Sequence, residues 1–112
     1  MVPENPVKRL PRRLGCPVEL SLELLGGKWK PVILARLKGG ALRYGELRAA
    51  IPQLSDKMLT ERLGDLQAQG LVAKDAAVYR LTARGESLRP VLQALFDWGE
   101  QQAEALDVRF VP

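Results

Sequence analysis

Six polar or charged residues gather between Ser55 and Arg62, inside the stretch LSDKMLTERLGDLQAQGLV. Their hydroxyl, ammonium, guanidinium and carboxylate groups can form hydrogen bonds with the base edges and phosphates of a nucleic acid. A helix that only packs against its neighbours needs none of these side chains in particular. This stretch is therefore a candidate recognition surface, and a solvated polar face is the alternative.

Cys16 is the second candidate for chemistry, and it is the only cysteine of the chain. Pro17 pushes Cys16 toward the extended geometry of a helix N-cap, which would place the sulfur at the positive end of a helix, near Arg12 and Arg13. Such a position favours the reactive thiolate, so the thiol could sense oxidants. The alternative is an inert, partly buried side chain. Without a second cysteine, oxidation would yield an intersubunit or mixed disulfide, a sulfenic acid or an adduct.

The residues that are absent exclude most catalytic chemistry. The 112 residues include no histidine, which rules out Ser-His-Asp triads and Cys-His pairs, and one cysteine cannot build a zinc finger. We find no paired carboxylates in a pocket motif and no glycine-rich phosphate loop. We therefore expect no enzyme, no metal and no cofactor. The sequence also lacks a secretory signal and an apolar run of the roughly 18 residues that a membrane span needs, so we expect a cytoplasmic protein without membrane contact.

Positive charge is concentrated in the middle of the chain. The net charge is +4, yet eight bases and three acids give residues 28–62 alone a sum of +5. Residues 1–15 sum to +3 and residues 63–112 to −2. This segregation fits one face that meets a polyanion and another that meets protein, although an ordinary solvated surface is also compatible with it.

Proline, glycine and the spacing of apolar residues predict a mainly helical fold with a small β-hairpin. Helices are expected over 17–25, from near 28 to 38, over 44–51, from 56 to about 69, and from 83 onward with an interruption near Pro90. A short extended piece is expected at Leu42 and Arg43, and the hairpin strands are 71–74 and 78–81. Ser55 should cap the fourth helix, whose leucine stripe faces inward. Two helices joined by a tight turn and followed by a hairpin form a winged helix-turn-helix. We divide the chain into a flexible basic arm, 1–15, and one domain, 16–112.

Four segments in this order also resemble a known family. They are CPVELSLELLGGKW, RYGELRAAIPQLSDKMLTERLGDLQAQGLV, YRLTARGESLRPVL and DWGEQ. Each segment is a weak signal alone, but their order and spacing are similar to those of the HxlR-type winged-helix regulators, within the MarR-like set of bacterial transcription factors. The resemblance covers about residues 16–102. It implies a homodimer that binds operator DNA through the second helix of the helix-turn-helix, pairs through its N- and C-terminal helices and, in several members, senses oxidants through the cysteine at the position of Cys16.

Two sets of residues are candidates for contacts with partners. The candidate DNA contacts are Ser55, Lys57, Met58, Thr60, Glu61, Arg62, Arg43, Arg48, Lys28 and Lys30. The candidate dimer residues are Val18, Leu22, Leu92, Leu95, Phe96 and Trp98. We expect a homodimeric transcriptional repressor that binds double-stranded DNA and responds to a small-molecule or oxidant inducer. Because the predicted wing is short and has no arginine at its tip, a protein-interaction module without DNA binding is the alternative.

Overall fold

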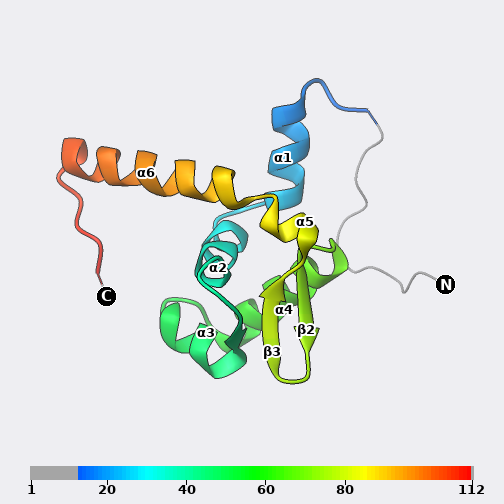
Figure 1. Cartoon of the computed structure of the whole chain (residues 1–112). Helices are drawn as coiled ribbons and strands as arrows, with labels where there is room; N and C mark the ends of the chain where they lie inside the picture. The colour runs from blue at the N-terminus through cyan, green and yellow to red at the C-terminus, as the bar shows by residue number, and fades with distance from the viewer. Residues whose placement is uncertain (1–12, 112) are drawn as a thin grey trace.

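Six helices and three short strands build the fold of residues 13–111, which are the residues described by this computed structural model (Figure 1). In chain order they are α1 Pro17–Leu25, α2 Trp29–Leu37, β1 Leu42–Arg43, α3 Tyr44–Ala50, α4 Asp56–Ala68, β2 Val72–Asp75, β3 Val78–Leu81, α5 Ala83–Glu86 and α6 Arg89–Leu106. The helices predicted from the sequence are confirmed to within one or two residues. Most of the predicted basic arm lies outside the described residues.

The core is built mainly of leucine and isoleucine side chains where α2, α3 and α4 meet. On α4, Leu59, Leu63 and Leu66 recur at intervals of three and four residues, so they share one face, and each is at most 1% exposed. Ile33 and Leu34 of α2 pack into the same cluster. Truncating such a buried leucine to alanine typically costs about 2–5 kcal/mol. The inner face of α4 is thus fixed by packing.

The sheet has one strand more than the hairpin that the sequence predicted. β3 lies in the centre, with β2 on one side and β1 on the other, and both neighbours are antiparallel to it. Leu42 pairs with Tyr79, which ties the start of the helix-turn-helix to the wing. The strands β2 and β3 turn at Ala76 and Ala77, and Ala76 has a φ of 54°, in the left-handed region.

Hydrogen bonds of the Thr82 side chain hold the connection between the sheet and the last two helices. The Thr82 hydroxyl accepts a hydrogen bond from the backbone N–H of Gly85 at 3.0 Å and donates one to the carbonyl oxygen of Gly70 at 2.6 Å. Pro90 then stands in the first turn of α6, where a missing N–H is tolerated. The predicted interruption near Pro90 is confirmed as a break between α5 and α6.

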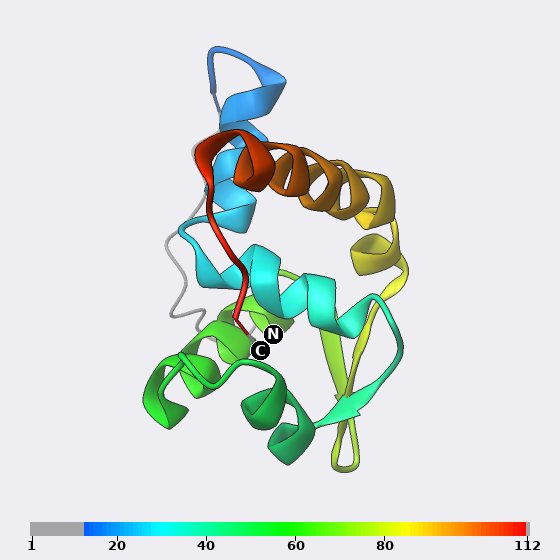
Figure 2. The same ribbon diagram turned by 90° about the vertical axis from the view of Figure 1, so that its left-hand side faces the viewer.

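Two helices project from the body of the molecule. Figures 1 and 2 show α6 running outward from α5, and α1 extending from the body on the side away from α3 and the sheet. No residue of α1 is buried, and Leu92 is the one buried residue of α6. Among residues 13–111, none of the helices has the length and apolar character that a membrane crossing requires.

Candidate nucleic-acid interface

The N-terminus of α4 is shaped by local hydrogen bonds. Ser55 is extended and its hydroxyl accepts a hydrogen bond from the N–H of Met58 at 3.1 Å, which confirms the predicted N-cap. Asp56 follows at the positive end of the helix dipole, where a carboxylate is stabilised. With 13 residues, α4 is about 20 Å long, a length that fits across a DNA major groove.

The outer face of α4 is uncovered over its first two turns. Lys57, Thr60 and Glu61 are all exposed, so their polar groups are accessible to a partner. Arg62 is half-buried, and its guanidinium donates to the carboxylate of Asp65 at 2.9 Å. Met58 is also half-buried and packs against the core, so it presents only part of its side chain outward.

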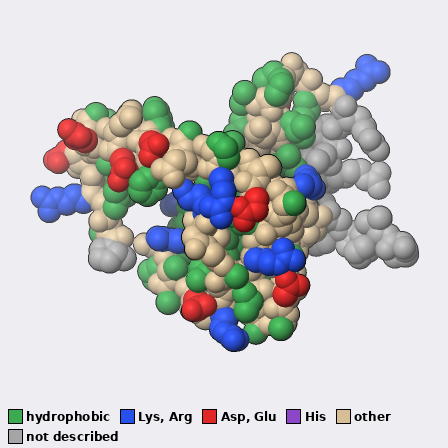
Figure 3. Space-filling model, in the orientation of Figure 1, with side chains coloured by type: hydrophobic (Ala, Val, Ile, Leu, Met, Phe, Trp, Pro, Cys, Tyr) green, Lys and Arg blue, Asp and Glu red, His purple; other side chains and the backbone are tan. Residues whose placement is uncertain are grey.

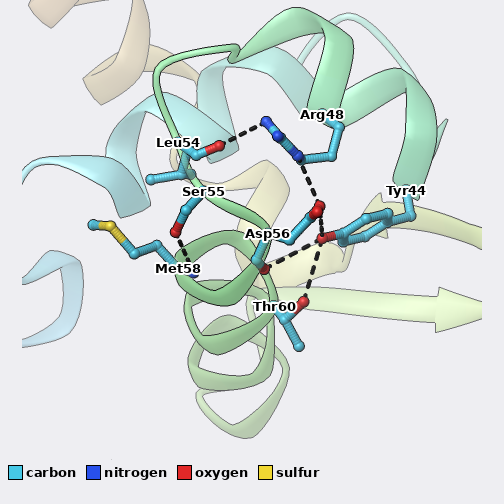
Figure 4. A network of polar contacts seen from close by, with 7 residues as sticks. All are labelled: Tyr44, Arg48, Leu54, Ser55, Asp56, Met58 and Thr60. Atoms are coloured by element: carbon cyan, nitrogen blue, oxygen red, sulfur yellow. Dashed lines mark hydrogen bonds and ion pairs between the residues drawn. The ribbon is translucent and has the colours of Figure 1, made fainter.

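A polar network joins α3 to the start of α4 (Figure 4). The guanidinium of Arg48 donates to the Asp56 carboxylate at 2.8 Å and to the carbonyl oxygen of Leu54 at 2.6 Å. The Tyr44 hydroxyl lies 2.9 Å from the same carboxylate and 3.3 Å from the Thr60 hydroxyl. The hydrogen bond from Tyr44, followed by that from Arg48, lowers the pKa of Asp56 below its ordinary value. Asp56 is therefore ionised at neutral pH and holds both partners.

This network was not predicted from the sequence. Tyr44 was not among the candidate DNA contacts, and Arg48 was one of them, whereas in the structure Arg48 pairs with Asp56 of the same chain. One signal was present, because Tyr44 and Arg48 are four residues apart and thus share a face of α3. Their common partner lies beyond the turn, and sequence spacing does not reveal that approach.

The flanking bases differ in how accessible they are. Arg43 and Lys28 are exposed, and the Lys28 ammonium lies 4.5 Å from the ring centroid of Trp29. The prediction of Lys30 as an accessible DNA contact is wrong. Its side chain is only 7% exposed, and its ammonium lies 3.5 Å from the amide oxygen of Gln69, because α2 packs against α4 on that side.

The wing is short and carries few unpaired charges. Arg80 forms an ion pair with Asp75 across the two strands, and Lys74 lies over the ring of Tyr79. The turn residues Ala76 and Ala77 offer no side-chain hydrogen bonds. The short wing without an arginine at its tip is confirmed.

Cys16 lies at the N-cap of α1, as the sequence predicted, and its side chain is exposed. The Glu19 carboxylate accepts a hydrogen bond from the Cys16 backbone N–H at 3.0 Å, so an acidic group shares this helix end with the sulfur. The sequence prediction had missed this acidic neighbour. Residues 13–111 contain no cluster of His, Cys, Asp or Glu that could hold a metal ion.

Apolar side chains are exposed on both projecting helices. On α1, Val18 and Leu22 are 63% and 64% exposed, and on α6, Leu95, Phe96 and Trp98 are similarly uncovered. In Figure 3, apolar side chains are visible along both helices, and acidic ones gather on the outer part of α6. Leu92 was predicted to join this surface, and that prediction is wrong. Leu92 is 3% exposed and lies in the core, and beside it the exposed Gln93 accepts a hydrogen bond from Lys38 at the end of α2.

The helix pair α3–α4, the three-stranded sheet and the exposed face of α4 together define a winged helix-turn-helix protein. Residues 24–107 match the HxlR-like helix-turn-helix family, and the chain belongs to that family. The HTH-type transcriptional regulator YdeP of Bacillus subtilis is 36% identical over 100 residues, which cover 83% of this chain and 78% of YdeP. YkvN of the same organism is 39% identical over 100 residues, with coverage of 83% and 85%.

Solved structures agree with this assignment. The redox regulator HypR in its oxidized form superposes with a TM-score of 0.73 at 33% identity, over 86% of this chain and 100% of HypR. Quinone-bound YodB from Bacillus subtilis gives a TM-score of 0.69 at 37% identity, over 77% of this chain and 99% of YodB. The chain is a transcriptional regulator of the HxlR type, and its relatives are regulators rather than enzymes.

Proposed function

We propose that this regulator is a homodimeric repressor of the cytoplasm that places the N-terminal half of α4 in the major groove of operator DNA. The observation that carries the proposal is that one face of α4 is apolar and buried while the opposite face is polar and exposed. Its leucines are buried, while Lys57, Thr60 and Glu61 remain exposed next to a capped helix N-terminus. Base contacts would come from these side chains, and phosphate contacts from Ser55, Arg43 and Lys28.

Pairing of two copies would cover the apolar residues of α1 and α6. A monomer that exposes them leaves an unusually apolar surface in water, and a twofold partner would remove that surface from solvent. Two copies related in this way would present their α4 helices about 34 Å apart, which is one turn of DNA.

Cys16 would receive the inducing signal. It is exposed on α1, one of the two helices proposed to pair, so modification of its sulfur would favour one arrangement of the dimer over another. HypR and YodB, which this chain resembles, have been solved in oxidized and quinone-bound forms respectively. We propose oxidants or electrophiles as the inducing signal.

A retardation assay with duplex DNA over a range of salt concentrations tests the DNA interaction. Replacing Arg43 and Lys28, the proposed phosphate contacts, together with Ala should weaken binding at least tenfold and flatten the salt dependence, by about 0.9 in slope for each phosphate that is no longer neutralised. Arg109→Ala is the matched control, because it removes the same kind of charge from the exposed tail beyond α6. A double variant that binds like the wild type would show that another element meets the DNA.

One observation favours the second candidate, a protein-interaction module without DNA binding. The wing presents an internally paired Arg80 and a tip of two alanines, so it offers little to a phosphate or a minor groove. The salt titration separates the two candidates. A DNA-binding regulator must lose affinity steeply with salt, and an interaction module would retain no duplex even in dilute buffer.

A further inference from the structure

The hydrogen-bond partners of Tyr44 determine which group is the donor and which the acceptor in each of its hydrogen bonds. Asp56 is ionised, because hydrogen bonds from Tyr44 and Arg48 stabilise its charged form, so its carboxylate can only accept. The Tyr44 hydroxyl has one proton, and its shortest contact, at 2.9 Å, is with that carboxylate. Tyr44 therefore donates to Asp56, since a charged acceptor makes the stronger hydrogen bond.

The direction of the next hydrogen bond follows. Thr60 lies 3.3 Å from the Tyr44 oxygen, and either hydroxyl could be the donor from distance alone. Because the Tyr44 proton is already engaged, Thr60 must donate its own proton to Tyr44. The lone pairs of the Thr60 oxygen then remain for a partner outside the chain, and Thr60 is exposed on α4.

We infer that Tyr44 is a specificity-determining residue, which fixes Thr60 as a hydrogen-bond acceptor so that it selects a base carrying an amino group. This inference rests on the proposed function, in which α4 enters the major groove. In that groove adenine presents its N6 amino group and cytosine its N4 amino group, whereas guanine and thymine present carbonyl oxygens at the equivalent positions. A free threonine hydroxyl can serve either kind of base, because it both donates and accepts. The orienting chain from Asp56 through Tyr44 removes that ambiguity.

The test is a selection of bound duplexes from a random pool, followed by affinity measurements on the selected site and on variants of it. For wild type, we expect one base position per half-site to prefer adenine or cytosine by about 3- to 10-fold, the value of one hydrogen bond. Thr60→Val should remove that preference, and Thr60→Ser, which keeps the hydroxyl, should retain it. Tyr44→Phe should also remove the preference while binding to unrelated duplex changes by less than about twofold.

The double variant Tyr44→Phe with Thr60→Val should bind both the selected site and unrelated duplex as tightly as Thr60→Val does, a result that loss of structure would not give. Its preference should equal that of Thr60→Val, since Tyr44 acts only through Thr60. Tyr79→Phe is the matched control, because Tyr79 lies in β3 and takes no part in the network of Tyr44, Asp56 and Thr60, so removal of its hydroxyl should leave the preference intact. If Tyr44→Phe unfolds, Asp56→Ala tests the same chain of hydrogen bonds.

Failure of the proposed function and failure of this inference give different results. A wild-type protein that selects no duplex would overturn the proposed function together with this inference. A wild-type preference that persists unchanged in Tyr44→Phe, or one that Thr60→Val leaves in place, would overturn the inference alone.

Discussion

Gly85 is the position where the smallest substitution should do the most damage. A Cβ added there would lie 2.2 Å from the backbone oxygen of Leu71 and 3.2 Å from the Leu81 Cβ. This oxygen is a backbone atom of Leu71, the residue that precedes β2, so the clash cannot be relieved by rotating a side chain. To accept Gly85→Ala, α5 and the base of the wing must separate until that distance exceeds 3.0 Å.

The expected cost follows from this geometry. Forcing an extra methyl group into packed structure typically costs about 1–3 kcal/mol, and the small gain in helix propensity from alanine offsets only part of it. We expect Gly85→Ala to lower the free energy of unfolding by about 2 kcal/mol. For a domain of this size that corresponds to a fall of roughly 10 °C in Tm. Denaturant and thermal unfolding should be followed by circular dichroism at fixed protein concentration, because self-association would shift both values.

Gly64 supplies the matched control. It lies inside α4, is exposed, and has nothing within 4 Å of the position where a Cβ would stand. Gly64→Ala should therefore raise the free energy of unfolding by about 0.5–1 kcal/mol, through helix propensity alone. The same chemical change thus has opposite signs at two helical positions. Equal stability of Gly85→Ala and the wild type would refute the packing argument.

Substitutions elsewhere probe the core, the dimer, the thiol and the response to acid. Leu92→Ala should lower the free energy of unfolding by about 2–4 kcal/mol, whereas the exposed Leu95→Ala should instead weaken self-association in sedimentation experiments. Cys16→Ser should bind DNA normally but lose any response to a thiol oxidant in a retardation assay. The hydrogen bond from Tyr44, and then that from Arg48, lowers the pKa of Asp56 in the folded protein below the ordinary value of 3.8. The ionised Asp56 therefore contributes fully to the stability of the fold above pH 3.8, and this contribution is lost as the pH falls through the lower pKa of the folded state. Asp56→Asn should lack this component in acid unfolding titrations, and identical pH profiles would contradict the assignment.

The helical skeleton could be predicted because its signals are local. Pro17 and Gly26 mark the limits of α1, and Ser55 marks the start of α4 through a contact with the residue three positions on. The extended piece at Leu42 and Arg43 was predicted, and it is confirmed as strand β1, but its pairing with β3 was not predicted. Strand β1 has only two residues, and its partner strand lies more than thirty residues away along the chain. Neither its length nor an alternating pattern therefore indicates this pairing.

The predictions for Lys30 and Leu92 failed for a different reason, because they depend on which side of a helix is covered by other elements. Lys30 was predicted as a DNA contact, but α2 is covered along most of its circumference and the Lys30 ammonium reaches the amide of Gln69. Leu92 could not be distinguished from Leu95 by composition. Only the meeting of α2 with the first turns of α6 decides which leucine is enclosed.

None of the nine residues of α1 is buried, although Leu25 at its C-terminal end packs against the core. A helix of nine residues is only marginally stable in water, so in the proposed dimer contacts from a second copy would supply much of what holds α1 in place. In that dimer the thiol-bearing helix would fray at low copy number and would be held in place at high copy number. The amount of the protein in the cell would then set how strongly the proposed thiol sensor responds.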